Sequence, residues 1–161
     1  MIFWVPQHKE PRWKSYVVET TEPVLTPQQC DEFIRIGQSE PQVKGTTNMN
    51  DADSQKYRKS TISWIFLNKE EAIPTYQIIK RWMETINSNH FGFDAMQMTE
   101  HGQYAEYSKG GFYNWHMDSS VGMPNMPPVR KISMTLLLND PKEFEGGELE
   151  FMTADNNPPQ L

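Results

Sequence analysis

The stretch Tyr107-Ser-Lys-Gly-Gly-Phe-Tyr-Asn-Trp-His-Met-Asp118 joins a glycine turn to a run of alternating residues, and it decides which fold the chain is predicted to adopt. In an extended strand, side chains at positions i and i+2 point the same way. His116 and Asp118 are therefore predicted to project together, with Asn114 beside them. The alternate residues are predicted to face the opposite, apolar side: Tyr113, Trp115 and Met117.

The pair His116 and Asp118 has the composition of a metal site. An imidazole nitrogen and a carboxylate oxygen suit a borderline divalent ion such as Fe(II), and two such ligands leave coordination positions open for substrate oxygens and dioxygen. Taken alone, a His-x-Asp pair is a weak signal, because a histidine beside an aspartate often makes only a surface hydrogen bond. The other histidines are His8, His90 and His101, and each is predicted to be a surface or packing residue. Only His101 lies in the same strand-rich region as His116.

Further segments around this stretch are typical of strands separated by glycine turns. They are about residues 94–107, 112–117, 130–139 and 148–152. Gly146-Gly147 is interpreted as a turn requirement with no chemistry attached.

Residues 130–139 alternate in character and are predicted to have one core face. Ser133, Thr135 and Leu137 share the other face. The predicted core residues are Ile132, Met134, Leu136 and Leu138.

Two helices are predicted in the first half of the chain. Thr26-Pro27-Gln28-Gln29 contains a capping threonine, a first-turn proline and the glutamine of a capping box, so a helix begins there, and Gly37 is predicted to end it. Its apolar face would carry Cys30, Phe33 and Ile34. A longer helix is predicted to open at Pro74 and to pack four residues inward at helical spacing: Tyr76, Ile79, Met83 and Ile86.

The segments around these helices are predicted to be two strands and a loop. Residues 13–20 and 58–67 are rich in strand formers, and Ile62, Trp64 and Phe66 are predicted to share a face. Residues 39–57 are polar and are interpreted as a loop.

Short strands after a helical first half predict an α+β, mainly β, fold: a double-stranded β-helix, or jelly roll, with N-terminal flanking helices. We expect one domain over residues 1–161, in which residues 1–93 support a partial catalytic core at 94–161.

Composition excludes several classes of protein. The net charge of −6 disfavours nucleic acid or anionic membrane as a partner. No apolar run approaches the length of a membrane span, the N-terminus lacks the features of a secretory signal, and the single Cys30 cannot form an internal disulfide. A cytoplasmic protein is predicted.

The order of motifs resembles the prolyl-4-hydroxylase-like branch of the 2-oxoglutarate and Fe(II)-dependent oxygenases, above all the PKHD-type hydroxylases. The motifs are a tyrosine and glycine turn before His-x-Asp, an Arg-Lys-Ile-Ser strand that ends in Leu-Asn, and a Gly-Gly-Glu-Leu turn. The resemblance covers about residues 96–151.

The resemblance implies a role for four residues. His116 and Asp118 match the first two iron ligands, Tyr107 matches a tyrosine that helps to hold 2-oxoglutarate, and Thr135 lies on the strand that lines the cosubstrate pocket. Packing of Tyr107 on the barrel wall is the alternative for that residue. The implied cofactors are Fe(II) and 2-oxoglutarate, with ascorbate as a further candidate. The implied reaction hydroxylates a C–H bond of a peptidyl or small-molecule substrate with dioxygen and yields succinate and carbon dioxide.

The chain departs from the family pattern after His116. The family has a distal histidine some fifty residues further on, followed by an arginine or lysine that pairs with 2-oxoglutarate, and neither position exists here. We therefore expect a C-terminally truncated domain that lacks its last strands and is inactive alone. The alternatives are a non-catalytic jelly-roll binding module with a partial metal site, a cupin-type metal enzyme that does not use 2-oxoglutarate, and an interaction scaffold.

Overall fold

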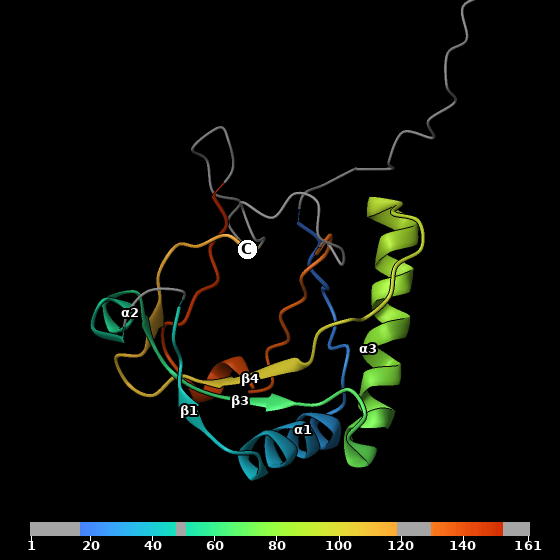
Figure 1. Ribbon diagram of the computed structural model, residues 1–161. Helices are drawn as coiled ribbons and strands as arrows, with labels where there is room; N and C mark the ends of the chain where they lie inside the picture. The colour runs from blue at the N-terminus through green and yellow to red at the C-terminus, as the bar shows by residue number, and fades with distance from the viewer. Residues whose placement is uncertain (1–16, 48–50, 119–129, 153–161) are drawn as a thin grey trace, which may run out of the picture.

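The computed structural model describes residues 17–47, 51–118 and 130–152. Within these residues the chain forms three α-helices and two small antiparallel sheets (Figure 1). In chain order the elements are α1 (Pro27–Ser39), β1 (Val43–Lys44), α2 (Asp51–Tyr57), β2 (Arg58–Lys59), β3 (Thr61–Ile65), the 3-10 turn Glu70–Ala72, α3 (Ile73–Ile86), the π-helical turn Asn87–Phe91, β4 (Gly102–Glu106), β5 (Phe112–Tyr113) and the 3-10 turn Pro141–Glu143.

Helix α1 begins as predicted from its capping box. The Thr26 backbone N–H donates to Gln29 Oε1 at 2.8 Å, and the Gln29 backbone N–H donates to Thr26 Oγ1 at 3.3 Å. These reciprocal bonds satisfy two backbone donors that the first helical turn leaves without a partner. Phe33 and Ile36 are the deeply buried side chains of the helix, whereas Cys30 and Ile34 are half-buried.

The prediction that Gly37 ends α1 is wrong, because the helix continues to Ser39 and Gly37 lies inside it. A Cβ atom at this position would lie 2.3 Å from Cγ of Tyr104. Glycine therefore serves here to let the ring of Tyr104 pack on the helix backbone, and a helix end is not its role.

Strand β3 is the centre of a three-stranded sheet of order β1-β3-β4, and α1 packs against that sheet (Figure 1). Thr61 pairs with Glu106 at one end of the β3–β4 ladder and Ile65 pairs with Gly102 at the other. On the α1 side, Ile65 is buried and the Ser63 hydroxyl donates to the Gly37 carbonyl at 2.6 Å. This bond fixes the sheet to the helix in one register.

The second face of β3 is the one that the sequence analysis assigned to Ile62, Trp64 and Phe66. Ile62 is buried on it, but Trp64 and Phe66 are exposed. The best-packed face of the strand is the alternate one, because α1 covers that side.

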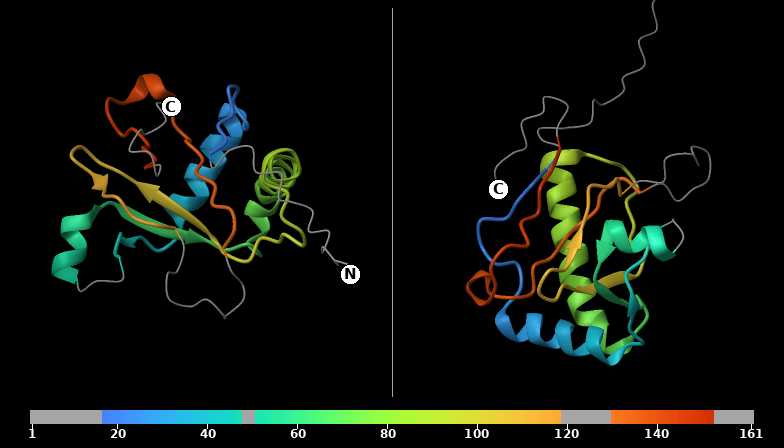
Figure 2. Two further views of the ribbon diagram at one scale, coloured as in Figure 1. Left: turned by 90° about the horizontal axis from the view of Figure 1, so that it is seen from above. Right: turned by 90° about the vertical axis from the view of Figure 1, so that its left-hand side faces the viewer.

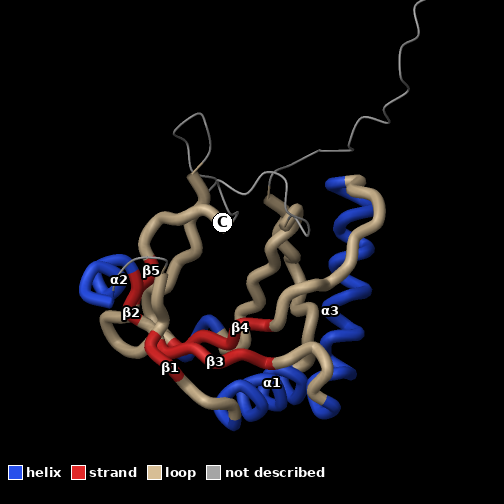
Figure 3. The backbone as a smooth tube through the Cα atoms, in the orientation of Figure 1, coloured by secondary structure: helices blue, strands red, loops and turns tan. Residues whose placement is uncertain are grey.

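The predicted polar loop at 39–57 is only partly a loop. It contains β1, which pairs with β3, and helix α2, which leads directly into β2. The hydroxyl of Ser54 holds the inner side of α2, where it accepts from the Thr47 backbone N–H at 2.6 Å. Ser54 is fully buried. Figures 2 and 3 show α2 with β2 and β5 at the end of the molecule remote from α3.

Helix α3 packs inward as predicted. Tyr76 and Ile79 are buried, Met83 packs against the core and Ile86 is half-buried. The Tyr76 hydroxyl donates to the Ile65 carbonyl at 2.6 Å and accepts from the Gly102 backbone N–H at 2.9 Å. One side chain therefore ties α3 to β3 and to the start of β4. None of the helices in the described ranges combines the length and the apolar character that a transmembrane span requires.

Several predicted strands are shorter or absent. Regular strand structure covers only 102–106 of residues 94–107 and only 112–113 of residues 112–117. Residues 17–20, 130–139 and 148–152 are described without strand structure, and residues 13–16 lie outside the described ranges. A strand requires a ladder partner, and no ladder joins these segments to another described residue.

Residues 131–138 nevertheless keep the predicted alternation of exposure. Ser133, Thr135 and Leu137 are exposed, and the intervening side chains are half-buried. Three of the latter pack against the main core: Met134, Leu136 and Leu138. The apolar pattern of this segment is thus confirmed where its regular strand geometry is not.

The described chain is an α+β structure with antiparallel sheets and helices that precede most of them. This confirms the α+β class, whereas the predicted predominance of β structure is not found, because helices cover more of the described residues than strands do. The division of the domain near residue 93 stays a prediction, as does the jelly roll.

Candidate metal centre

A tight turn brings the His-x-Asp segment back along β4. Gly110 has a φ of 72°, and the Gly111 backbone N–H donates to the Ser108 carbonyl at 2.6 Å. Only glycine adopts a positive φ without steric cost, so the glycine pair is needed to reverse the chain here. After the turn, β5 pairs with β2, with Tyr113 opposite Arg58.

His116 and Asp118 lie next to each other, as predicted. The Nε2 atom of His116 is 3.2 Å from Oδ1 of Asp118. The side chains are 40% and 53% exposed, so both ligand atoms are accessible from solvent.

A hydrogen bond at Nδ1 of His116 determines which ring nitrogen is available to bind a metal. Nδ1 of His116 lies 2.9 Å from the Asn114 carbonyl oxygen. Because a carbonyl only accepts, Nδ1 carries the proton of the neutral ring, and the lone pair of Nε2 faces Asp118. Metal-binding histidines are commonly oriented through this kind of bond on the opposite ring nitrogen.

The alternating side chains beyond Tyr113 do not pack as predicted. Strand β5 ends at Tyr113, and Trp115 and Met117 are exposed. Tyr113 does not face away from His116, since the two rings stack at a centroid distance of 3.7 Å and an interplanar angle of 12°. The side chains of His116 and Asp118 therefore come together through a bend in the chain and this ring stack. They do not come together through the strand alternation that was predicted.

Arg130 contacts the backbone of Asp118, the second residue of the pair. Its guanidinium donates to the Asp118 carbonyl oxygen at 2.5 Å, and it forms a two-point ion pair with the carboxylate of Glu100, in which Nε lies 2.9 Å from Oε1. The guanidinium lowers the pKa of Glu100, and the Glu100 carboxylate raises the pKa of Arg130. This bridge holds the backbone of a candidate ligand against the segment that precedes β4.

The two residues assigned to the cosubstrate are accessible. Tyr107 follows β4 directly, and both Tyr107 and Thr135 are exposed. Leu149, the leucine of the Gly-Gly-Glu-Leu turn, is exposed too.

No third ligand joins the pair within the described residues, where no group of three or more histidine, cysteine, aspartate or glutamate side chains could hold a metal ion. His101 is a surface residue, one of the two predicted possibilities: its ring contacts Phe66 with centroids 4.5 Å apart at a tilt of 55°, and its Nδ1 accepts from the Leu67 backbone N–H.

Sequence analysis missed the part of the site contributed by α2 and β2. Asn114 donates from its backbone N–H to the Tyr57 carbonyl at 2.8 Å and from its side chain to the Lys56 carbonyl at 3.1 Å. The guanidinium of Arg58 lies over the Tyr113 ring, 4.4 Å from its centroid. The only signal available was the strand-like run that starts at Arg58, and an arginine is rarely predicted to be buried.

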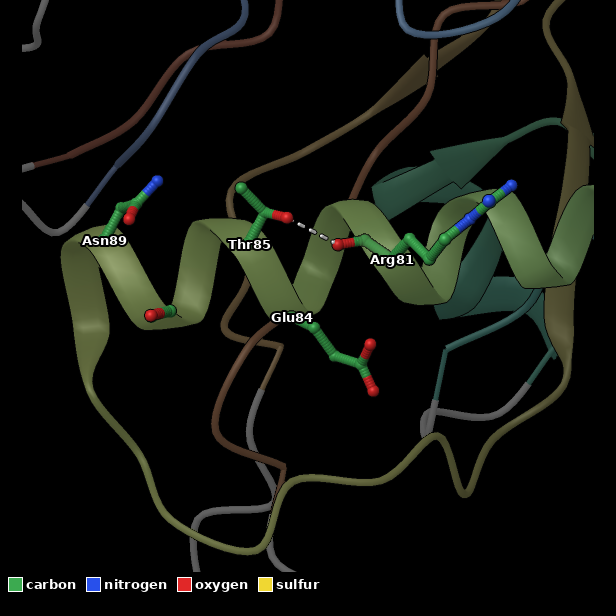
Figure 4. Close-up of a pocket in the computed structure, with 5 residues that line it drawn as sticks. Arg81, Glu84, Thr85 and Asn89 are labelled. Atoms are coloured by element: carbon green, nitrogen blue, oxygen red, sulfur yellow. Dashed lines mark hydrogen bonds between the residues drawn. The ribbon is translucent and has the colours of Figure 1, made fainter.

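A shallow pocket lies on α3 and the turn after it, and neither His116 nor Asp118 lines it (Figure 4). Figure 4 shows its side chains spread along the helix instead of converging on one point, with Glu84 directed away from Thr85. The Thr85 hydroxyl is already satisfied by the Arg81 carbonyl at 2.9 Å. The lining residues are Arg81, Glu84, Thr85, Ser88 and Asn89, and the pocket offers no catalytic arrangement.

Comparison with known proteins agrees with the resemblance found in the sequence. Residues 102–160 match the profile of the 2OG-Fe(II) oxygenase superfamily. A PKHD-type hydroxylase of Teredinibacter turnerae is 50% identical over 50 residues, which is 30% of this chain and 22% of that protein. A PKHD-type hydroxylase of Pseudomonas fluorescens is 43% identical over 47 residues, 27% of this chain and 21% of that protein.

These matches span about a fifth of each relative. No solved structure gives a significant match to the chain. The matched segment contains the glycine turn, the His116–Asp118 pair and the Gly146-Gly147 turn, in which both glycines have positive φ. Residues 102–160 are therefore similar to the 2-oxoglutarate and Fe(II)-dependent oxygenase superfamily, and part of this segment is similar to PKHD-type hydroxylases.

Proposed function

We propose that His116 and Asp118 are two of the three protein ligands of an Fe(II) ion in a 2-oxoglutarate-dependent hydroxylase. The observation that carries this proposal is the contact of 3.2 Å between His116 Nε2 and Asp118 Oδ1, with the Nδ1 proton of the histidine directed away into the Asn114 carbonyl. An iron ligand needs the deprotonated nitrogen, and here that nitrogen faces the carboxylate.

The separation of these two atoms fits a common metal ion. Nitrogen and oxygen ligands lie about 2.1 Å from a divalent first-row metal, so two ligands at right angles are about 3.0 Å apart. With Nε2 unprotonated, the two atoms are both acceptors and repel each other, and a cation between them would remove that repulsion. Two ligands on adjacent positions leave the rest of the coordination sphere for a third protein ligand, the cosubstrate and dioxygen.

We assign Tyr107 and Thr135 to the binding of 2-oxoglutarate. A phenol and a hydroxyl group can both donate to a carboxylate, and both side chains are exposed in the described structure. The fold proposed for the complete site is a jelly roll, with residues 130–139 as one of its strands. The alternation of buried and exposed side chains along this segment supports that assignment.

When bound, Fe(II) and 2-oxoglutarate supply the activation of dioxygen and the oxidation of a substrate C–H bond, with succinate and carbon dioxide as coproducts. His116 and Asp118 would hold the metal, Tyr107 and Thr135 would orient the cosubstrate, and the Asn114 carbonyl would keep the proton of the neutral imidazole on Nδ1. The substrate is a peptidyl group or a small molecule. Ascorbate is proposed as an accessory reductant.

We expect weak metal binding and little turnover from the 161-residue chain alone, because the described residues supply two ligands and a third is needed to complete the triad. The non-catalytic binding module remains the second candidate, and the same observation supports it. The two candidates differ in whether succinate is formed.

The test is Fe(II)-dependent formation of succinate from 2-oxoglutarate, with and without added imidazole as a replacement for the third ligand. In parallel, paramagnetic broadening by Mn(II) locates the metal by nuclear magnetic resonance. We expect selective broadening of the backbone amide signals around His116 and an increase in affinity with imidazole. His116→Ala should abolish both effects, and His90→Ala is the matched control, since His90 lies in the turn after α3. Broadening that is the same in both variants would end the metal assignment.

A further inference from the structure

Arg58 is a buried cation without a charged partner in the described part of the chain. Its side chain is only 4% exposed, and its hydrogen bonds go to neutral acceptors, Ser60 Oγ and Gln103 Oε1, each at 2.7 Å. Burial of a guanidinium away from water costs free energy unless other interactions compensate for it. Such a residue is therefore expected to have a role that a shorter or neutral side chain cannot fill.

The face of the Arg58 guanidinium is occupied by an aromatic ring. Its Cζ atom lies 4.4 Å from the centroid of the Tyr113 ring, because Arg58 and Tyr113 are directly paired in the β2–β5 ladder. The His116 ring is stacked on Tyr113 at 3.7 Å and nearly parallel to it. A ring face covered at this distance leaves no room for a guanidinium, so we infer that Arg58 and His116 lie on opposite faces of Tyr113. Three planar groups thus form a continuous stack from the buried guanidinium to the accessible imidazole.

The end of α2 holds the same segment through its backbone. The Asn114 backbone N–H donates to the Tyr57 carbonyl and its side-chain amide donates to the Lys56 carbonyl, while the Asn114 backbone carbonyl accepts from His116 Nδ1. Together, the stack determines the plane of the imidazole and the hydrogen bond determines its rotation in that plane. With both restrained, Nε2 can face only the side on which Asp118 lies.

We propose that Arg58 is a positioning residue for His116, acting through Tyr113. Arg58 lies outside residues 102–160, so the support for the metal ligand comes from a part of the chain that the family match does not cover. The metal-related consequence rests on the proposed function, but the orientation of the ring is independent of any metal. A lysine cannot replace Arg58 in this role, because it lacks the planar group that stacks on an aromatic face.

The experiment measures the His116 tautomer by its ring ¹⁵N chemical shifts in metal-free protein under alkaline conditions, and then Mn(II) affinity. Arg58→Lys keeps the charge and loses the planar group, and Tyr113→Leu removes the ring between the two. Both should shift the ring from the Nδ1–H tautomer toward a mixture and weaken Mn(II) binding about tenfold. Tyr113→Phe, which keeps the ring, should retain the wild-type tautomer. Lys59→Gln, an exposed neighbour in β2, is the matched control for charge.

Amide spectra establish that each variant is folded, and Tyr113→Leu carries the test if Arg58→Lys does not fold. Wild-type tautomer populations in the folded variants would overturn the proposal. If Mn(II) affinity also stays unchanged, the positioning role fails while the metal site stands. If the tautomer shifts but wild-type protein binds no Mn(II), the positioning role stands and the proposed function fails.

Discussion

The N-terminal layer, residues 25–79, differs sharply in packing from the oxygenase segment, which is the described part of the profile match up to residue 152. Among the described residues, every fully buried side chain lies between Leu25 and Ile79, whereas none lies within 102–152. The segment that carries the family motifs is therefore not the one that carries the core. It is held in place by contacts to α1, β3 and α2, and its candidate ligands depend on residues that form a separate, better-packed layer.

The proposed metal site gives a chemical reason for this difference in packing. A metal site needs accessible ligand atoms and open coordination positions, so its residues cannot fill a core. A core needs close packing of apolar side chains, which Phe33, Ile36 and Ile65 supply between α1 and β3. The β3–β4 ladder joins the two regions, and side-chain hydrogen bonds of Tyr76 to Gly102 and of Arg58 to Gln103 add to it. Arg130 acts within the second region, where it contacts Asp118.

The largest effect is expected inside the N-terminal layer. Ile65→Ala should lower the free energy of unfolding by about 2–5 kcal/mol, because Ile65 is 1% exposed and truncation leaves a cavity. Leu137→Ala in the oxygenase segment, where the side chain is 61% exposed, should change it by less than about 0.5 kcal/mol. Urea unfolding compares the two. Equal losses would mean that the oxygenase segment has a core of its own.

The next largest effect is expected where the two regions join. Tyr76→Phe removes a hydroxyl that donates to Ile65 and accepts from Gly102, and should cost about 1–3 kcal/mol because the Gly102 N–H loses its partner. Faster hydrogen exchange at the Gly102 amide would report the loss locally. Tyr57→Phe, at an exposed ring, is the control and should leave that amide unchanged.

Arg130→Gln should affect the site more than the stability. It removes the bond to the Asp118 carbonyl and the ion pair with Glu100, so we expect about a tenfold loss of Mn(II) affinity and a stability change of less than about 1 kcal/mol. Metal titration measures the loss of affinity, and urea unfolding measures the change in stability. Arg81→Gln on α3 is the matched control, and an equal loss of metal affinity there would refute a specific role for Arg130.

The smallest effect is a pH dependence. Arg130 lowers the pKa of Glu100 in the folded state. The stabilisation is thus present above the unfolded-state pKa of about 4.3 and is lost as the pH falls through the lower folded-state value. Because this carboxylate is about half exposed, Glu100→Gln should remove at most about 1 kcal/mol of acid-sensitive stability. The double variant with Arg130→Gln should show no further loss, and an additive loss would argue that the two side chains do not interact.

Local signals predicted much of this structure. The capping box placed the start of α1, and the helical spacing after Pro74 placed the inward face of α3. Alternation along 131–138 identified its half-buried side, and the glycine pairs marked turns with positive φ. The His116–Asp118 pair was predicted from two residues and a short context, and the structure places the two side chains in contact.

Other features could not be predicted, because they depend on residues far apart in the chain. A glycine near the end of a helical pattern predicts a helix end, but Gly37 instead contacts the ring of Tyr104, 67 positions away in the sequence. Polar residues at 51–57 form a helix because Ser54 and the following strand have partners elsewhere. Strand geometry at 130–139 needs a neighbouring strand, which an alternating pattern cannot supply by itself.

The sequence by itself determined which groups are available: a histidine and an aspartate two residues apart, in a motif order similar to that of iron oxygenases. Only the tertiary structure decided how that pair is aligned, through a buried arginine, a tyrosine ring and a second arginine from three separate segments. The reason is physical, since residue type sets which atoms can bind a metal, whereas the direction of those atoms depends on long-range packing and hydrogen bonds.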